Sequence, residues 1–170
     1  DFSKEVVDAF IAGRKVLADG AIAGSITAAQ QAALATAIQT ASLTWEKCIA
    51  ATVVHYINDV RSDMSGFDEG SFADASNFTT LAKHWSEMKG FALGLQFSSV
   101  SLFRATDSSL TDLKSVLALM GDGPVLADGS QAGEVGADAA RIDTYLADLL
   151  TARGLLQEAY GFDQENVENW

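Results

Sequence analysis

The sequence predicts an all-α protein, an antiparallel up-and-down bundle of four main helices plus a short one. Three observations favour this fold class. The chain has 170 residues, of which 48% are hydrophobic, enough for a single domain over residues 1–170 with a core of its own. Pro124 is the only proline, so long helices can run without the residue that most often breaks them. Apolar residues recur at helical spacing, whereas alternating strand patterns are scarce.

The first two helices are predicted from their apolar repeats and their caps. The first is expected from Phe2 to Asp19, with Gly20 as its C-cap. The second is expected from about Thr27 to about Met64, where Gln30 would complete a capping box with Thr27. Its predicted buried seam starts apolar and ends polar. This seam consists of Leu34, Ile38, Ala41, Trp45, Cys48, Thr52, His55 and Asp59.

The third helix is expected from Phe72 or Asp74 to about Ser101. Its predicted seam consists of Leu81, His84, Met88, Phe91 and Leu95. Gly90 and Gly94 would allow a neighbouring helix to approach closely. Lys83 and Lys89 point away from the seam and are expected in solvent, and Trp85 would face a second partner surface.

The last part of the chain is predicted as a short helix, a loop and a final long helix. The short helix runs from Leu110 to Met120, capped by Ser109 or Thr111, and the loop from Gly121 to Gly133. The final helix spans about Glu134 to Tyr160. The polar tail after it is expected to fray unless Phe162 or Trp170 docks.

Charge and cysteine content limit the function classes. A formal net charge of −12 repels phosphate backbones, so nucleic acid is not expected as a partner, whereas cations are attracted. Cys48 is the only cysteine, so an intramolecular disulfide is excluded. No apolar run reaches the roughly 18 residues of a membrane span, so no transmembrane segment is expected. Because the chain starts at Asp1 without methionine, we expect it to be the C-terminal part of a longer precursor.

The two histidines carry the best candidate chemistry. His55 is followed at i+4 by Asp59 and His84 at i+3 by Glu87, and both spacings place the pair on one helical face. A turn around residues 66–70 would bring the two faces to the same height, at ~1.5 Å of rise per residue on each side. Imidazole with carboxylate suits iron or zinc better than magnesium or calcium. The alternative is that each histidine is an ordinary hydrogen-bonded residue of the bundle.

Other site patterns are absent from the sequence. There is no G-x-S-x-G elbow, no P-loop and no dinucleotide fingerprint. Asp122 and Asp128 lie near glycines, but they lack the alternating oxygen spacing of a calcium loop. The helical HExxH of zinc proteases is also absent.

Three segments resemble an uncharacterised family of bacterial cell-envelope proteins. The segment His84 to Phe97, HWSEMKGFALGLQF, is similar to that family's HW-x-EMK-x-FALG-(L/F)-QF segment. LMGDGPVL (Leu119 to Leu126) and LLQEAYGFD (Leu155 to Asp163) continue the resemblance. The family looks related to the imelysins, all-helical envelope proteins with a GxHxxE motif that are associated with bacterial iron acquisition. Only HxxE matches here, because Ala82 replaces the motif's glycine.

This resemblance, taken together with the two histidine pairs, predicts a cell-envelope or secreted protein that binds a metal, iron or zinc, as a divalent or ferric ion without catalysis. His84 and Glu87 would be its first ligands, with His55 and Asp59 as second-choice ligands. Two alternatives remain open. One is a structural or interaction module whose long acidic helices self-associate or assemble with a missing N-terminal segment or chain. The other is a metallopeptidase, the activity for which the imelysins were named.

Overall fold

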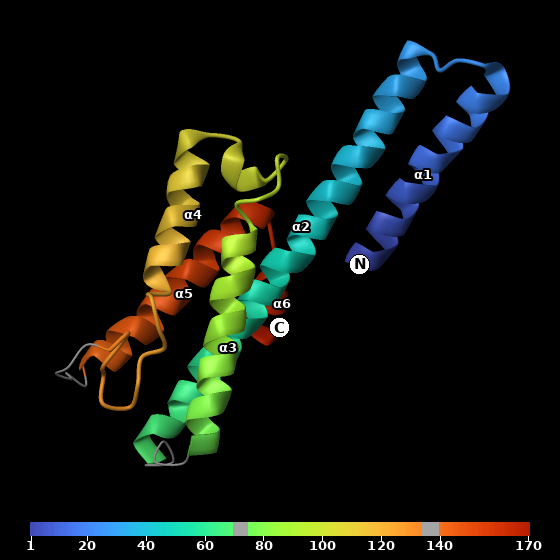
Figure 1. Ribbon diagram of the computed structural model, residues 1–170. Coiled ribbons are helices and arrows are strands. Elements are labelled where there is room, and N and C mark those ends of the chain that lie inside the picture. Colours follow the sequence, from blue (N-terminus) through green and yellow to red (C-terminus); the bar gives the residue numbers. More distant parts are fainter. Residues whose placement is uncertain (70–74, 134–139) are drawn as a thin grey trace.

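The protein is described by a computed structural model that covers residues 1–69, 75–133 and 140–170. Within these ranges the chain forms six α-helices and no strand, which confirms the predicted all-α bundle (Figure 1). The longest are α2 (Ala28–Ser65), α1 (Phe2–Ala23), α5 (Ala140–Tyr160) and α3 (Ala75–Gly94). Two shorter helices complete the fold, α4 (Asp107–Leu119) and α6 (Gln164–Asn169). None of the helices in the described ranges is both long and apolar enough to cross a membrane.

The helices α1 and α2 form a hairpin whose turn is capped as the sequence predicts. The Thr27 hydroxyl accepts a hydrogen bond from the Gln30 amide at 3.2 Å, and the Gln30 side chain accepts one from the Thr27 amide at 2.9 Å.

The predicted C-cap at Gly20 is wrong. The first helix continues to Ala23 and ends at Gly24, whose φ of 77° is left-handed. Gly20 is instead buried against Ile26, which leaves no room for a side chain.

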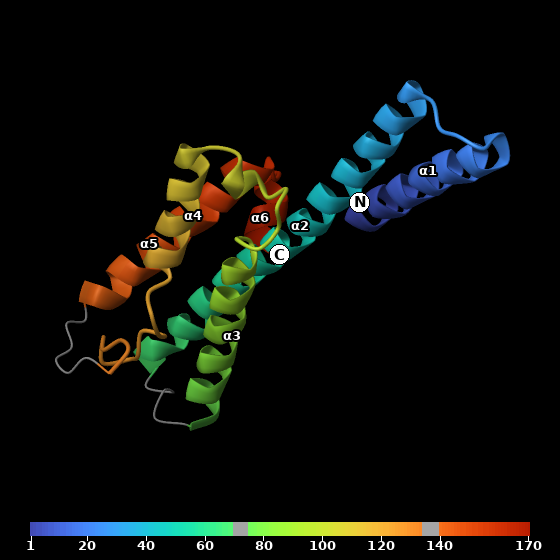
Figure 2. The same ribbon diagram turned by 45° about the horizontal axis from the view of Figure 1, so that its top comes forward.

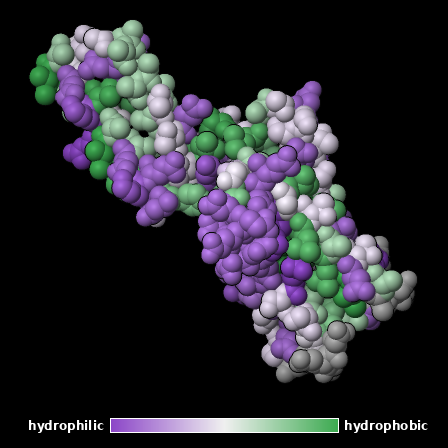
Figure 3. All heavy atoms as spheres, turned by 180° about the vertical axis from the view of Figure 1, so that it is seen from behind, coloured by the Kyte–Doolittle hydropathy of each residue, from purple (hydrophilic) through white to green (hydrophobic). Residues whose placement is uncertain are grey.

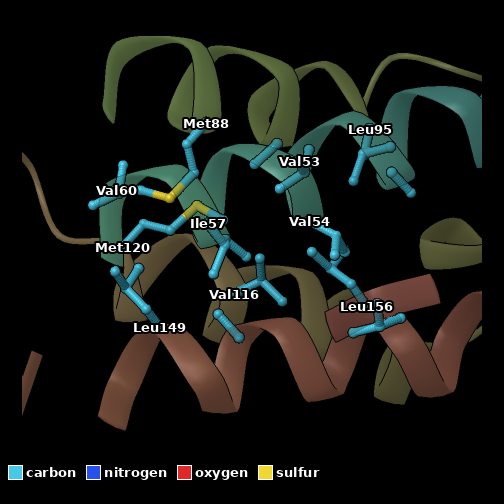
Figure 4. Close-up of a cluster of buried hydrophobic side chains, with 14 of the residues drawn as sticks. Val53, Val54, Ile57, Val60, Met88, Leu95, Val116, Met120, Leu149 and Leu156 are labelled. Atoms are coloured by element: carbon cyan, nitrogen blue, oxygen red, sulfur yellow. The ribbon is translucent and has the colours of Figure 1, made fainter. Parts of the chain in front are cut away.

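The hydrophobic core is shared by the second half of α2 with α3, α4 and α5, whereas α1 lies outside it. In Figure 4, Ile57 of α2 and Met88 of α3 point toward Val116 of α4 and Leu149 of α5. All four of these side chains are fully buried. Apart from Phe2, whose ring packs near Phe162 and Trp170, α1 packs along the first half of α2, so the hairpin projects from this bundle (Figures 1 and 2).

The predicted seam of α2 is wrong about which face is buried. The core face of α2 carries Ala50, Val53, Val54, Ile57, Val60 and Met64. On the predicted seam, Ile38 is 58% and Trp45 66% exposed. Periodicity shows that a helical face is apolar but does not show which element covers it, and α2 has apolar residues on more than one face. On α3, Leu81, Met88 and Leu95 are buried as predicted, while Phe91 is 41% exposed.

Several predicted helix ends are also shifted. The third helix ends at Gly94 rather than near Ser101, because the amides of Leu95, Gln96 and Phe97 bond to carbonyls three residues back and the chain turns there. A short 3₁₀ helix follows at Leu102–Arg104. The helix α4 starts earlier than predicted, with Thr106 as its N-cap. The expected starts at Phe72, Asp74 and Glu134 lie outside the described residues.

The C-terminal tail docks rather than frays. Phe162 is 8% exposed, and its ring lies edge-on to Trp170 at a centroid distance of 4.9 Å. The Asn58 amide of α2 donates hydrogen bonds to the carbonyls of Val167 at 3.0 Å and Trp170 at 2.9 Å. These bonds hold α6 beside the middle of α2, as both ribbon views show.

A buried carboxylate, Glu46, lies in α2 where the hairpin meets the bundle. It is 3% exposed, and its Oε1 accepts hydrogen bonds from the Tyr160 hydroxyl at 2.7 Å and the Ser101 hydroxyl at 2.9 Å. The Leu102 amide adds a third at 3.1 Å. Burial and the contact with Glu46 raise the pKa of Tyr160, so its hydroxyl keeps the proton that it donates. Glu46 thereby joins α5 and the segment after α3 to the centre of α2.

The helix α3 contains glycines that do not serve helix packing. A Cβ added at Gly90 or Gly94 would meet nothing within 4 Å, so the predicted close approach of a neighbouring helix there is wrong. At Gly20, by contrast, an added Cβ would overlap the Ile26 Cγ2 methyl.

Glycine-to-alanine substitutions at these positions should change stability in opposite directions. Gly90→Ala should raise the free energy of unfolding by about 0.5–1 kcal/mol, because alanine loses less backbone entropy in an exposed helix. Gly20→Ala should lower it by about 1 kcal/mol, because Ile26 must move. Urea denaturation of both variants measures the difference. Equal stabilisation by the two substitutions would contradict the packing at Gly20.

Candidate metal site between α2 and α3

The histidine and carboxylate residues meet where α2 and α3 pack side by side. His55, Asp59 and Asp63 follow one another at steps of four residues, so they share a face of α2. His84 reaches this face from α3 and lies near both Asp59 and Asp63. The predicted match in height between the two helices is therefore confirmed.

His84 is held in place by Asp63. Its Nδ1 lies 2.8 Å from Asp63 Oδ2, and the two side chains are 19% and 20% exposed. A carboxylate on one imidazole nitrogen fixes the ring orientation and leaves the other nitrogen free to bind a ligand. In this arrangement His84 Nε2 lies on the Asp59 side, 3.9 Å from Asp59 Oδ2.

Asp59 lies between the two imidazoles. The same oxygen, Oδ2, is 3.3 Å from His55 Nε2 and 3.9 Å from His84 Nε2. The side chain of His55 is 48% exposed and that of Asp59 32% exposed. The cluster therefore lies at the edge of the bundle, open to ions from solvent on its His55 side.

Glu87, predicted as a first ligand, contacts other groups. Its Oε2 lies 3.6 Å from Lys83 Nζ and is buried without a hydrogen bond, and its carboxylate lies beside the Tyr56 ring. Burial first, and then this contact with Glu87, raises the pKa of Tyr56. The structure thus brings together His84, His55 and Asp59 of the predicted set, while Glu87 lies beside Lys83.

Sequence reasoning missed Asp63. The signal was present, because Asp63 lies four residues beyond Asp59 and eight beyond His55 on the same helical face. Spacing along the sequence instead favours Glu87, three residues after His84 on α3, as the partner of that histidine. Contact between facing helices, rather than spacing within one helix, gives His84 its partner.

The donor atoms form a partial rather than a finished metal centre. Within the described ranges, no three or more His, Cys, Asp or Glu side chains are already arranged to hold an ion. Ligands about 2.1 Å from one ion stand roughly 3–3.5 Å from each other. The distance of 3.3 Å from His55 Nε2 to Asp59 Oδ2 fits this range. The distance of 3.9 Å from His84 Nε2 to Asp59 Oδ2 requires a small side-chain rotation.

Two other residues of the HWSEMK segment have structural roles. Trp85 Nε1 donates to the Met120 carbonyl at 3.0 Å, and Lys89 Nζ donates to the carbonyls of Leu117 and Gly121 at 2.6 Å each. The prediction that Lys89 is solvated is wrong, because its side chain is 16% exposed and caps the end of α4. Burial lowers the pKa of Lys89. Trp85 does face a second surface, which belongs to this chain itself.

Removing the Lys89 ammonium should destabilise the fold. Lys89→Met leaves the Leu117 and Gly121 carbonyls without their charged donor and should lower the free energy of unfolding by about 1.5–3 kcal/mol. Lys15→Met is the matched control, because its side chain is 74% exposed and that of its partner Asp19 is 48% exposed. The control should change stability by less than about 0.5 kcal/mol. Thermal and urea unfolding measure both, and similar losses for the two variants would argue against the capping role.

No model of a known protein family, no curated protein and no solved structure matches this chain. The resemblance to imelysin-like envelope proteins therefore stays a prediction that rests on the three quoted segments. The geometry between α2 and α3 supplies an independent basis for proposing a function.

Proposed function

We propose that this chain is a metal-binding helical protein of imelysin-like type, which holds an iron or zinc ion between α2 and α3 without catalysis. The observation that carries the proposal is the position of Asp59 Oδ2, which lies 3.3 Å from His55 Nε2 and 3.9 Å from His84 Nε2. The ligands are His55, Asp59 and His84. Asp63 is the positioning residue that orients the His84 ring.

The chemistry of these donors supports the choice of metal. Two imidazoles with one carboxylate, and positions left open to water, are typical of Fe(II) sites and are also suitable for zinc. Magnesium and calcium prefer sites made of oxygen atoms alone. A net charge of −12 adds a field that attracts cations to the surface.

The contacts of Glu87 support binding rather than hydrolysis. A metallopeptidase needs a general base near the water that the metal activates. Glu87, the carboxylate of the HxxE segment, instead lies beside Lys83, with its Oε2 3.6 Å from Lys83 Nζ. A role in iron uptake at the cell envelope, or after secretion, follows from the resemblance of the segments and is part of the proposal.

Metal binding can be tested directly on the chain purified without chelator. Titration with Zn²⁺, and with Fe²⁺ under nitrogen, followed by elemental analysis, should give close to one ion per chain. His84→Ala and Asp59→Asn should abolish this binding because each removes a ligand. Asp63→Asn should weaken it by about 10–100-fold, because the His84 ring loses its orientation.

The matched control is Glu87→Gln, which should bind the ion as the unaltered chain does. Loss of metal in this variant would instead support the ligand pair His84 and Glu87 that the segment resemblance implies. Failure of the unaltered chain to hold near-stoichiometric metal would refute the site. Digestion of casein by the metal-loaded chain, abolished by Glu87→Gln, would show that the non-catalytic part of the proposal is wrong.

A further inference from the structure

The projecting hairpin, residues 1–45, has an unusual distribution of side-chain sizes. Its two helices meet through small residues, with Ala9, Gly13 and Ala37 buried between them. A Cβ added at Gly13 would lie 3.5 Å from Leu34 Cδ1 and 3.6 Å from Ala37 Cβ, so the helices are close together there. No large side chain is fully buried between α1 and the first half of α2 in the described structure.

The large apolar side chains of the hairpin face outward instead. Figure 3 shows hydrophobic residues on the surface of the projecting arm, at the upper left of that view. Seven of them are more than half exposed: Val7 53%, Phe10 67%, Ile11 62%, Leu17 53%, Ile22 89%, Ile38 58% and Trp45 66%. A helical hairpin that is stable by itself buries its largest apolar residues between its two helices. Their exposure here indicates that another element packs against the outer face of the hairpin.

Four of these residues, Phe10, Leu17, Ile38 and Trp45, gather along one groove. Phe10, Leu17, Leu34 and Ile38 line its first part, and Phe10 also borders a second hollow lined by Trp45. The spacing of Leu34, Ile38, Ala41 and Trp45 is that of a bundle seam, with alternating steps of four and three residues. This is the part of the predicted seam that the bundle of a single chain leaves uncovered.

Charge distinguishes the groove side of α1 from its opposite side. At 100° per residue, Phe10 and Leu17 fall on one side of the helix, while the ion pairs Lys4–Asp8 and Lys15–Asp19 fall on the other. The first half of α2, from Ala28 to Trp45, contains no charged residue. Arg14 is the only charged side chain that lines the groove.

The distribution of net charge favours a second copy of this chain as the occupant. Residues 1–45 contain four acidic and three basic side chains, so nearly all of the net charge of −12 lies in the rest of the chain. Two copies therefore repel one another everywhere except through their hairpins. A strongly basic partner would instead be drawn to the acidic bundle.

The size of the exposed surface is also suitable for a dimer. At about 150–250 Å² for a large side chain, the four that line the groove, each half to two-thirds exposed, offer on the order of 500 Å² of apolar surface per copy. A stable interface uses about 800 Å² per partner, including its polar rim. Two helices from each copy would complete a four-helix bundle, the usual solution for exposed helical seams.

We propose that the outer face of the α1–α2 hairpin is a homodimer interface, in which the hairpins of two copies pack into a four-helix bundle around Phe10, Leu17, Ile38 and Trp45. The interface is isologous, so each copy supplies the same face to a two-fold axis. The metal site lies elsewhere on α2, and this inference does not depend on it.

Sedimentation velocity and light scattering of the full chain over a wide concentration range test the proposal. The unaltered chain should reach twice the chain mass of 17.9 kDa. Phe10→Glu and Ile38→Glu should each raise the dimer dissociation constant by at least about 30-fold, because a charge would be buried at the centre of the interface. Added salt should strengthen the dimer by screening the repulsion between the acidic bundles.

The matched control is Phe78→Glu, which places the same substitution on a 44% exposed phenylalanine of α3, outside the hairpin. It should leave the dissociation constant unchanged. Circular dichroism of each variant shows whether its helices are intact, and these positions are already exposed in the single chain. A monomer at all concentrations, a trimer or larger ring, weakening by salt, or equal effects of Phe10→Glu and Phe78→Glu would each overturn the proposal.

Discussion

The arrangement of the helices depends on one buried carboxylate, Glu46 at the centre of α2. Burying a carboxylate is costly unless hydrogen-bond donors replace the water that it loses. The hydroxyls of Tyr160 and Ser101 and the Leu102 amide supply these donors on Oε1, while Oε2 is buried without a hydrogen bond. Any packing that separated α5 or the segment after α3 from α2 would leave this charge without compensation. Glu46 therefore selects one closed arrangement from the many that apolar packing alone would allow.

The candidate metal site follows from that arrangement. With the bundle closed, Val53 and Val60 of α2 share the core with Leu81 and Met88 of α3, which sets the height of the two helices relative to one another. His84 is thereby brought to the level of Asp59 and Asp63, although 21 residues separate it from Asp63 along the chain. The polar site lies at the rim of the same contact, where His55 remains in reach of solvent.

Features that depend on neighbouring residues could be predicted from the sequence, and those that depend on distant partners could not. The capping box of Thr27 and Gln30 is local, and its spacing was sufficient to place it. Lys89 was expected in solvent because its acceptors, the Leu117 and Gly121 carbonyls, belong to the end of another helix. Glu46 gave no signal at all, because its donors lie 55 to 114 residues away. The apolar residues through Ile38 and Trp45 do share one face of α2, as their spacing predicts. That face is not buried in the core of this chain, because periodicity does not identify which element packs against an apolar face.

Because α2 is one continuous helix, it fixes the distance between the hairpin groove and the histidine cluster. This single helix forms a wall of the hairpin groove near Ile38 and a wall of the histidine cluster near Asp59. At 1.5 Å per residue, these two points are roughly 30 Å apart along a stiff axis. If two chains join at their hairpins as proposed, their two candidate ion sites lie well away from the interface along α2. Each chain of such a dimer would then bind its ion independently of the other.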